Sequence, residues 1–260
     1  MKRHLALLAA LSLFASCASV DDEHRKGVAV LSYNIHHGEG TDGVFDLERL
    51  ARVIRESGAG LVALQEVDQN TGRAGGLDQT AELARLTGMY GVFGAAMPYD
   101  GGSYGEAVLS RWPILKVTTL SLSAAPDHEP RAALVIEVHP PGKRRLSFVG
   151  THLDHTKDES DRVRQATELH DLLGDGSLPT LLVGDLNATP ESAPMQVLLS
   201  AGWTPADPTH MPTYPSDAPT KKIDWILRSP GDSGQLTDAE VLHEPIASDH
   251  CPYRARWVLP

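Results

Sequence analysis

The sequence contains only two cysteines among its 260 residues, Cys17 and Cys251. Cys17 is expected to be lipidated, as described below, so Cys251 has no partner for an intramolecular disulfide. The folded chain must therefore be stabilised by a hydrophobic core rather than by a disulfide framework. Because Cys251 lies between His250 and Pro252 at the start of an apolar segment, we expect it to be packed and not to act as a nucleophile.

Basic residues are also scarce relative to acidic ones. The chain has 23 lysines and arginines against 34 aspartates and glutamates, which gives a formal net charge of −11. This balance disfavours a protein that holds a long polyanion through many phosphate contacts. A divalent metal ion at a site can invert the local field, so nucleic acid remains an alternative ligand that is not favoured.

The sequence has no apolar run of about 20 residues, the length that a membrane-spanning helix needs. Residues 5–14 form a shorter apolar segment that follows Lys2 and Arg3. The next residues, Phe14-Ala15-Ser16-Cys17, resemble a bacterial lipobox, in which the cysteine is lipidated and becomes the first mature residue. This arrangement indicates a signal peptide rather than a membrane-spanning helix.

We therefore expect residues 1–16 to be a signal peptide of the lipoprotein type and residues 17–26 to be a polar tether. The protein would be exported to the bacterial periplasm or cell surface and attached to the membrane through a lipid at Cys17. The alternative is a plain secretory signal that is cut near the same position.

The remaining residues, 27–260, lack internal repeats, low-complexity tracts and interdomain linkers, and 41% of the chain is hydrophobic. One domain with a sizeable core is expected, and we expect a monomer. Apolar runs and helical periodicity alternate along the chain, which predicts an α/β fold with mixed sheets. The predicted strands are 27–33, 61–64, 132–138, 145–150, 178–184, 222–227 and 251–258, with a hairpin over 107–120. The predicted helices are 45–57, 78–87, 158–173 and 192–200.

The stretch of residues 181–190 combines a buried strand with polar chemistry. The apolar run stops at Gly184, presents Asp185 and Asn187 one residue apart, and ends at Pro190. Side chains two residues apart on a strand point to the same side, so this carboxylate and this amide can converge on one ligand. The alternative, favoured for an isolated motif, is an Asx turn that ends the strand.

Similar polar residues gather at the ends of the other predicted strands, where α/β folds commonly place their sites. Their carboxylate and amide oxygens suit a hard cation such as Mg²⁺, and their histidines suit proton transfer or oriented hydrogen bonding. The residues concerned are Asn34, Glu66, His152, Asp154, Asp185, Asn187, Asp224, Asp249 and His250.

Seven short motifs in fixed order extend this pattern into a family resemblance. The motifs are Ser32-Tyr33-Asn34-Ile35-His36, Leu64-Gln65-Glu66-Val67, Glu129-Pro130-Arg131, Thr151-His152-Leu153, Gly184-Asp185-Leu186-Asn187, Lys222-Ile223-Asp224-Trp225 and Ser248-Asp249-His250-Cys251-Pro252. Together they resemble the endonuclease/exonuclease/phosphatase superfamily, which includes pancreatic deoxyribonuclease, apurinic endonucleases and neutral sphingomyelinases. The resemblance covers residues 27–259.

The resemblance implies a four-layered α/β sandwich, in which two packed mixed β-sheets are flanked by helices. It also implies phosphoester hydrolysis that depends on Mg²⁺, with Mn²⁺ as a substitute. Carried over by position, Asn34, Glu66 and Asp249 would bind the metal. Asp185 and Asn187 would position and activate the attacking water.

The resemblance assigns the two histidines to the phosphate group. His250 would act as general base or orient the phosphate, held by Asp224. His152 would contact the phosphate from the other side, with Glu129 as its carboxylate partner. In-line attack needs a polarised phosphoryl group, an oriented nucleophile and a donor to the leaving oxygen, and these residues supply that set.

The substrate is less determined than the reaction. The chain lacks the Trp-Cys-Asp-Arg signature of inositol polyphosphate 5-phosphatases, and no aromatic hairpin indicates a membrane-inserting sphingomyelinase. We expect a phosphodiesterase that acts on a small or lipid phosphoester. The alternatives are an endonuclease or exonuclease acting on DNA or RNA, and a non-catalytic binding module on the same fold.

Overall fold

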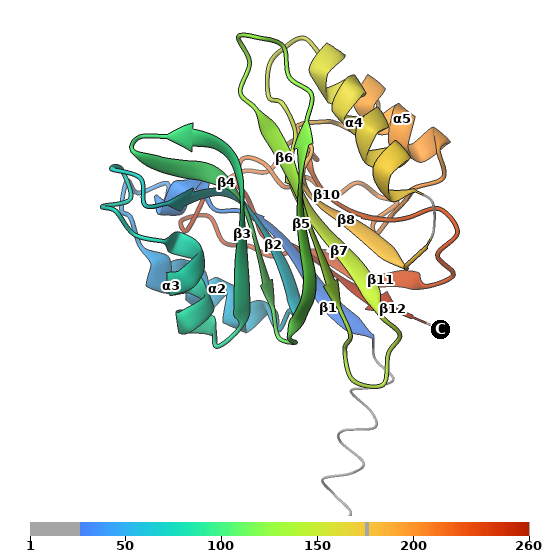
Figure 1. The fold of residues 1–260 in the computed structure, drawn as a ribbon, viewed down its shortest axis with the longest axis horizontal. Helices are drawn as coiled ribbons and strands as arrows, with labels where there is room; N and C mark the ends of the chain where they lie inside the picture. The colour runs from blue at the N-terminus through green and yellow to red at the C-terminus, as the bar shows by residue number, and fades with distance from the viewer. Residues whose placement is uncertain (1–26, 175–176, 260) are drawn as a thin grey trace, which may run out of the picture.

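The computed structural model describes residues 27–174 and 177–259 (Figure 1). The expected signal peptide and tether lie outside the described residues. Within these ranges, no helix has the length and apolar character needed to cross a membrane.

The described chain forms two six-stranded mixed sheets. The first sheet has the strand order β11-β12-β1-β2-β4-β3. Its strands are β1 (Val28–Asn34), β2 (Leu61–Gln69), β3 (Tyr90–Tyr99), β4 (Gly102–Ser110), β11 (Gln235–Val241) and β12 (Tyr253–Val258). The second sheet has the order β5-β6-β7-β8-β10-β9. Its strands are β5 (Ile114–Leu122), β6 (Arg131–Val138), β7 (Leu146–His152), β8 (Thr180–Asp185), β9 (Thr204–Pro205) and β10 (Asp224–Arg228).

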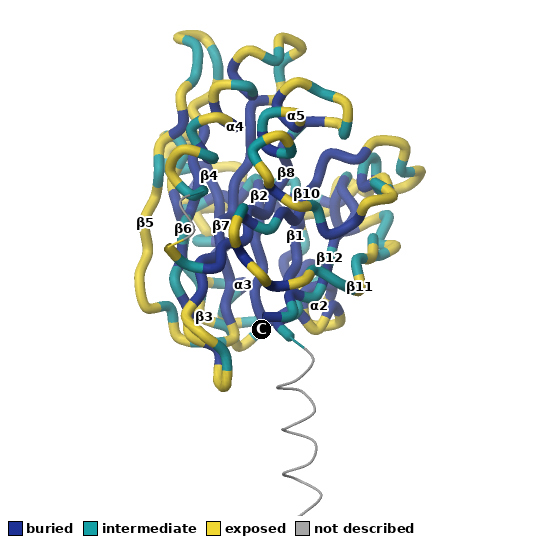
Figure 2. The backbone as a smooth tube through the Cα atoms, turned by 90° about the vertical axis from the view of Figure 1, so that its right-hand side faces the viewer, coloured by how far each residue is buried: buried dark blue, intermediate teal, exposed yellow. Residues whose placement is uncertain are grey.

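Helices cover the outer face of each sheet. The helices α2 (Leu47–Ser57) and α3 (Gln79–Thr87) pack on the first sheet, and α4 (Ser160–Leu173) and α5 (Ala193–Ser200) pack on the second (Figure 1). A short 3₁₀ helix, η1 (His36–Gly38), follows β1. Three buried hydrophobic clusters separate the layers, one between the sheets and one beneath each helical pair. The buried backbone lies mainly in the strands at the centre of the molecule (Figure 2). This arrangement confirms the predicted four-layered α/β sandwich.

Local sequence explains where the first two helices begin and end. Asp46 caps α2 by accepting a hydrogen bond from the backbone N–H of Arg49 at 2.9 Å, and Asp78 caps α3 in the same way. Both helices end at a glycine in the left-handed region, Gly58 and Gly88. Caps of this kind satisfy backbone groups that a helix end leaves free.

The predicted hairpin over residues 107–120 is wrong. β4 pairs with β2 and β3, whereas β5 pairs with β6 in the other sheet, so Trp112 and Pro113 lie in a connection between the sheets. The neighbour of β4 along the chain and in the sheet is β3, a strand that the sequence analysis did not predict. Much of β3 is only half-buried, and its glycine, alanine and proline residues give a weak apolar signal.

A parallel pair of strands lies near the centre of each sheet, β1 with β2 and β7 with β8. In the second sheet, His152 is in register with Asp185 at the carboxyl ends of the two strands. Because each pair ends at the same edge, the residues that follow these strands meet at one side of the sandwich. Cys251, which begins the segment before β12, is buried as expected.

Candidate active site

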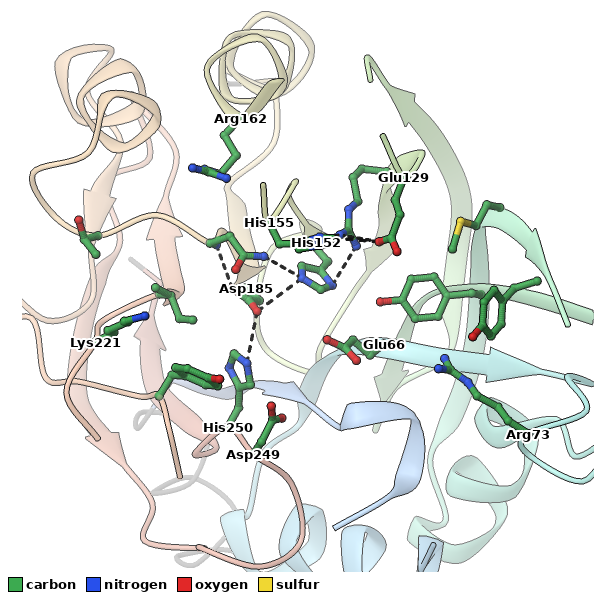
Figure 3. A pocket seen from close by; sticks show the side chains of 18 residues that line it. Glu66, Arg73, Glu129, His152, His155, Arg162, Asp185, Lys221, Asp249 and His250 are labelled. Atoms are coloured by element: carbon green, nitrogen blue, oxygen red, sulfur yellow. Dashed lines mark hydrogen bonds and ion pairs between the residues drawn. The ribbon is translucent and has the colours of Figure 1, made fainter. Parts of the chain in front are cut away.

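Both sheets contribute side chains to one open cavity of about 590 Å³ (Figure 3). The cavity reaches seven of the nine residues predicted for the site, namely Glu66, Glu129, His152, Asp185, Asn187, Asp249 and His250. The other two, Asn34 and Asp224, are fully buried behind it and hydrogen-bonded to lining residues.

Glu66 reaches the cavity because β2 contains a bulge. The register with β4 shifts between Leu64 and Val67, and Glu66 has a φ of 58°, in the left-handed region. A non-glycine residue in this region is strained, and such residues concentrate at functional sites. The bulge redirects the Glu66 carboxylate out of the alternation of the strand and toward the cavity.

Asn34 joins two of the acidic residues. Its side-chain Nδ2 donates to Glu66 Oε1 at 3.0 Å and to Asp185 Oδ2 at 3.2 Å. Its Oδ1 accepts from the backbone N–H of His36 at 3.1 Å. The amide therefore holds the carboxylates of the two sheets together, and its oxygen faces the backbone.

The motif around Asp185 forms an Asx turn and also lies in the cavity wall. Gly184 has a φ of 156°, and a Cβ there would collide with the backbone oxygen of Thr151. Asp185 Oδ1 accepts from the backbone N–H of Asn187 at 2.9 Å. Burial raises the pKa of Asp185 to about 7, and the neighbouring Asp224 carboxylate acts in the same direction. The Asx turn given as the alternative is therefore present, and its two residues also line the cavity.

His250 is held by a carboxylate. Its Nδ1 lies 3.0 Å from Asp224 Oδ2, and its Nε2 lies 3.6 Å from Asp185 Oδ2. The Tyr214 ring packs against the imidazole with a centroid separation of 4.8 Å. Burial alone would lower the pKa of His250, but Asp224 and Asp185 outweigh it and raise the value to about 10. The predicted pairing of His250 with Asp224 is present in the geometry.

His152 is held by a cation instead. Arg131 Nη1 lies 3.3 Å from His152 Nδ1, and Asp185 Oδ2 lies 3.5 Å from His152 Nε2. Asn187 Nδ2 approaches the same Nε2 at 2.9 Å. Burial and the charge of Arg131 hold the pKa of His152 well below its usual value.

Glu129 does not contact His152 in this geometry. Its Oε2 pairs with Arg131 Nη2 at 2.9 Å and lies 3.8 Å from His155 Nδ1. Arg131, at the start of β6, thus occupies the place beside His152 that the sequence analysis expected Glu129 to fill.

Glu106 is a buried acid whose place in the site the sequence analysis did not assign. It lies on β4, its side chain is fully buried, and its carboxylate oxygens make no hydrogen bond within residues 27–174 and 177–259. Burial raises its pKa well above the usual value, with Arg131 opposing and Glu66 reinforcing the shift. The sequence analysis began the predicted strand at residue 107, so Glu106 was left just outside it.

The donor set of the cavity fits a hard divalent cation. The carboxylates of Glu66, Asp185 and Asp249 all reach the cavity, and oxygen ligands of this kind are those that Mg²⁺ prefers.

The cavity rim carries cations that the sequence analysis did not select. Arg73 lies 4.5 Å above the centre of the Tyr99 ring and makes two hydrogen bonds to the buried Asp68, at 2.6 and 2.9 Å. On the opposite wall, Lys221 is exposed beside Tyr214 (Figure 3). The sequence gave no sign that Arg73 and Lys221 belong to the site, because they lie outside the predicted motifs and only the folded chain brings them to the rim.

Comparisons with known proteins agree with this geometry. The model of the endonuclease/exonuclease/phosphatase family matches residues 31–250. A family protein from Beutenbergia cavernae has a solved structure that is 24% identical with a TM-score of 0.76, over 90% of this chain and 72% of that one.

Two functionally named structures also share the fold. A mannosyl-6-phosphatase from Bacteroides thetaiotaomicron is 19% identical with a TM-score of 0.70, over 89% of this chain and 100% of that one. The human Nocturnin catalytic domain is 18% identical with a TM-score of 0.67, over 90% of this chain and 94% of that one. From the match of the family model across most of its length, the chain belongs to the endonuclease/exonuclease/phosphatase family of phosphoester hydrolases.

Proposed function

We propose that this protein is an exported, Mg²⁺-dependent phosphodiesterase that acts on a small or lipid phosphoester. The observation that carries the proposal is the convergence of a set of acids and histidines, from both sheets, on one open cavity: Glu66, Asp185, Asp249, His152 and His250. A degenerate binding module would be expected to have lost part of this set, and the set is complete.

In this proposal, the carboxylates of Glu66 and Asp249 hold the metal, and Asn34, the third residue predicted to bind it, positions Glu66 from behind the cavity. Glu66 and Asp249 supply oxygen ligands, and Asn34 keeps the Glu66 and Asp185 carboxylates at a fixed separation. When bound, Mg²⁺ supplies positive charge that polarises the phosphoryl group. Asn187 and Asp185 orient the attacking water, and the Asx turn between them limits their movement.

The two histidines have different roles in this proposal. His250, held by Asp224, faces the cavity as a cation and can orient or protonate a phosphate oxygen. His152 is neutral and can act through hydrogen bonding rather than through charge. Neither role requires a contact with Glu129.

The size and charge of the cavity support a small substrate. A volume of about 590 Å³ is in the range of small-molecule sites, and Arg73 and Lys221 place cations at its rim. The net charge of −11 opposes a long polyanion. The structurally similar mannosyl-6-phosphatase adds sugar phosphates to the classes worth testing.

The proposal is tested by hydrolysis assays on the purified protein after removal of metals with EDTA. The panel contains bis(p-nitrophenyl) phosphate, a sugar phosphate, phospholipid, sphingomyelin and plasmid DNA. We expect turnover of a non-nucleic substrate that returns with Mg²⁺ or Mn²⁺. We also expect that Glu66→Gln removes the turnover and that Glu56→Gln, which changes an exposed acid on α2, preserves it.

Two outcomes would contradict the proposal. If folded protein shows no metal-dependent turnover on any member of the panel, the chain is a binding module. If plasmid DNA alone is cleaved, it is a nuclease. Export is tested separately by mass spectrometry of the N-terminus, where we expect a diacylated Cys17 and where an unmodified start elsewhere would contradict the lipoprotein prediction.

A further inference from the structure

A second group of metal-ligand side chains lies beside the catalytic cavity and takes no part in the chemistry proposed above. It consists of His128 in the β5–β6 loop, Asp154 in the loop after β7, and Asp161 in the first turn of α4. One ligand atom from each residue lies within 4.8 Å of the other two. Three segments that are separate in the sequence therefore meet at one point.

The two carboxylates are buried, and one oxygen has no partner. Asp154 is 0% exposed and Asp161 is 1% exposed. Asp154 Oδ1 makes no hydrogen bond within the described residues, and it points toward His128 Nδ1 across 4.0 Å. A buried carboxylate oxygen without a donor costs free energy, and a bound cation is one way to offset that cost.

The outer sides of the carboxylates are already occupied. Asp154 Oδ2 accepts from Thr156 and lies 3.7 Å from Arg162 Nη1, and Asp161 Oδ1 pairs with Arg164. Asp161 Oδ2 accepts from the backbone N–H of Ala125 at 2.9 Å and also faces the imidazole, whereas Asp154 Oδ1 faces it without a donor. Outer contacts of this kind orient the ligands of metal sites.

His128 completes the set. Its Nδ1 lies 2.6 Å from Asp161 Oδ2, a hydrogen-bond distance, and a metal ion bound by both atoms would replace the shared proton and move the two atoms apart. The side chain is 29% exposed, so water has access to the remaining coordination positions. One imidazole with two carboxylates suits Zn²⁺ or Mn²⁺ better than Mg²⁺, which prefers oxygen ligands alone.

We propose that His128, Asp154 and Asp161 form a second divalent-cation site, which takes Zn²⁺ or Mn²⁺ and ties the β5–β6 loop to the start of α4. The site is separate from the catalytic metal site and does not depend on the proposed function. It bears on the catalytic cavity through the chain, because Glu129 follows His128 directly and Asp154 lies two residues after His152.

The proposal is tested by counting bound metal. The purified protein is stripped with EDTA, saturated with Zn²⁺, passed through a desalting column and assayed by inductively coupled plasma mass spectrometry. We expect His128→Gln to hold about one equivalent of Zn²⁺ less than the wild type, because metal sites with a missing ligand lose affinity steeply. Asp127→Asn is the matched control, since it removes a charge from the exposed neighbouring position and should leave the count unchanged.

A second measurement uses the wild type alone and remains informative if His128→Gln fails to fold. Crystals soaked in Zn²⁺ should show an anomalous difference peak between His128 Nδ1 and the two carboxylates. Equal metal counts in wild type and a folded His128→Gln variant would overturn the proposal. So would anomalous peaks at the catalytic cavity with none at this cluster, because His128 would then form only an ion pair with Asp161.

Discussion

The two histidines that flank Asp185 differ in the charge of their partners. His250 lies beside the Asp224 carboxylate, and its pKa is raised to about 10. His152 lies beside the Arg131 guanidinium, and its pKa is held well below the usual value. Each imidazole is within 3.6 Å of the same carboxylate oxygen of Asp185. Near neutral pH, His250 is therefore a charged ring beside a carboxylate, and His152 is a neutral ring beside a charged guanidinium.

The contrast shows that burial does not decide the charge of a histidine by itself. Both imidazoles are almost fully buried, and burial lowers the pKa of each. The neighbouring group determines the net direction, since a carboxylate favours the imidazolium and a guanidinium opposes it. Lys222 is a third buried base, and burial lowers its pKa to about 7.

The largest change in the difference between the two histidine pKa values is expected for Asp224→Asn. The substitution keeps an oxygen that can accept from His250 Nδ1 but removes the charge that raises the pKa. We expect the pKa of His250 to fall and hydrolysis to drop by about 10²–10⁴-fold, the range typical of general acid–base groups. NMR titration of the imidazole and steady-state kinetics measure the two effects. Asp217→Asn, an exposed acid, is the control, and an unchanged His250 pKa would contradict the assignment.

Lys222→Met tests how far burial alone lowers the pKa of a base that has no carboxylate hydrogen-bonded to it. In the folded protein Lys222 loses its proton near pH 7, whereas in the unfolded chain it keeps the proton to about 10.5. The unfolded state binds more protons between these values, so this group makes the wild type more stable as pH rises through that window. We expect the free energy of unfolding of the wild type, relative to the variant, to increase by roughly 3 kcal/mol from pH 6.5 to 9.5. Urea denaturation at both pH values measures it, and a pH-independent difference would show that Lys222 stays charged.

The low pKa of His152 is tested by Arg131→Gln. Removing the cation should raise the pKa of His152, although burial still keeps it below that of an exposed histidine. We expect activity to fall by roughly tenfold, because a positioned contact to a reacting group contributes about that much or more. The imidazole is followed by NMR and the activity by kinetics at pH 6 to 8. If the pKa of His152 does not rise, Arg131 is not the source of its low value.

The smallest effect is expected for Glu129→Gln. Its side chain is 44% exposed and contacts Arg131 and His155 rather than His152. We expect activity within about twofold of the wild type, as for most exposed ion pairs. A large loss in kcat would instead support the original expectation that Glu129 acts on His152. Steady-state kinetics on the substrate found by the hydrolysis panel give the answer.

Strand ends made much of the site predictable. A buried run followed by Asp185 and Asn187 predicted one wall of the cavity. The predicted ends of the strands that became β1 and β2 placed Asn34 and Glu66 in the site. These features are local in sequence, because an apolar run shows where a strand stops and the polar residues after it show what the edge presents. The family motifs, which occur in a fixed order along the chain, then indicated which of these polar residues act together.

The contacts that distinguish the two histidines were not predictable in this way. Which side chain lies beside His152 depends on the register of β6 against β7 and on the direction of Arg131, and neither is encoded in the spacing of Glu129 and His152. The bulge that turns Glu66 and the assignment of β4 and β5 to different sheets are likewise set by pairing between distant segments. These pairings can be read only from the described structure.

The course of β1 has a consequence for how an anchored molecule would meet its substrate. The strand begins at Val28, just after the expected tether, and ends at Asn34 behind the cavity. Seven residues of β-strand cover about 20 Å, so the chain enters at one edge of the sandwich and the cavity lies at the other. A lipid at Cys17, if the lipoprotein prediction holds, would be joined to the edge of the sandwich opposite the cavity, so that the attachment point would leave the cavity mouth uncovered.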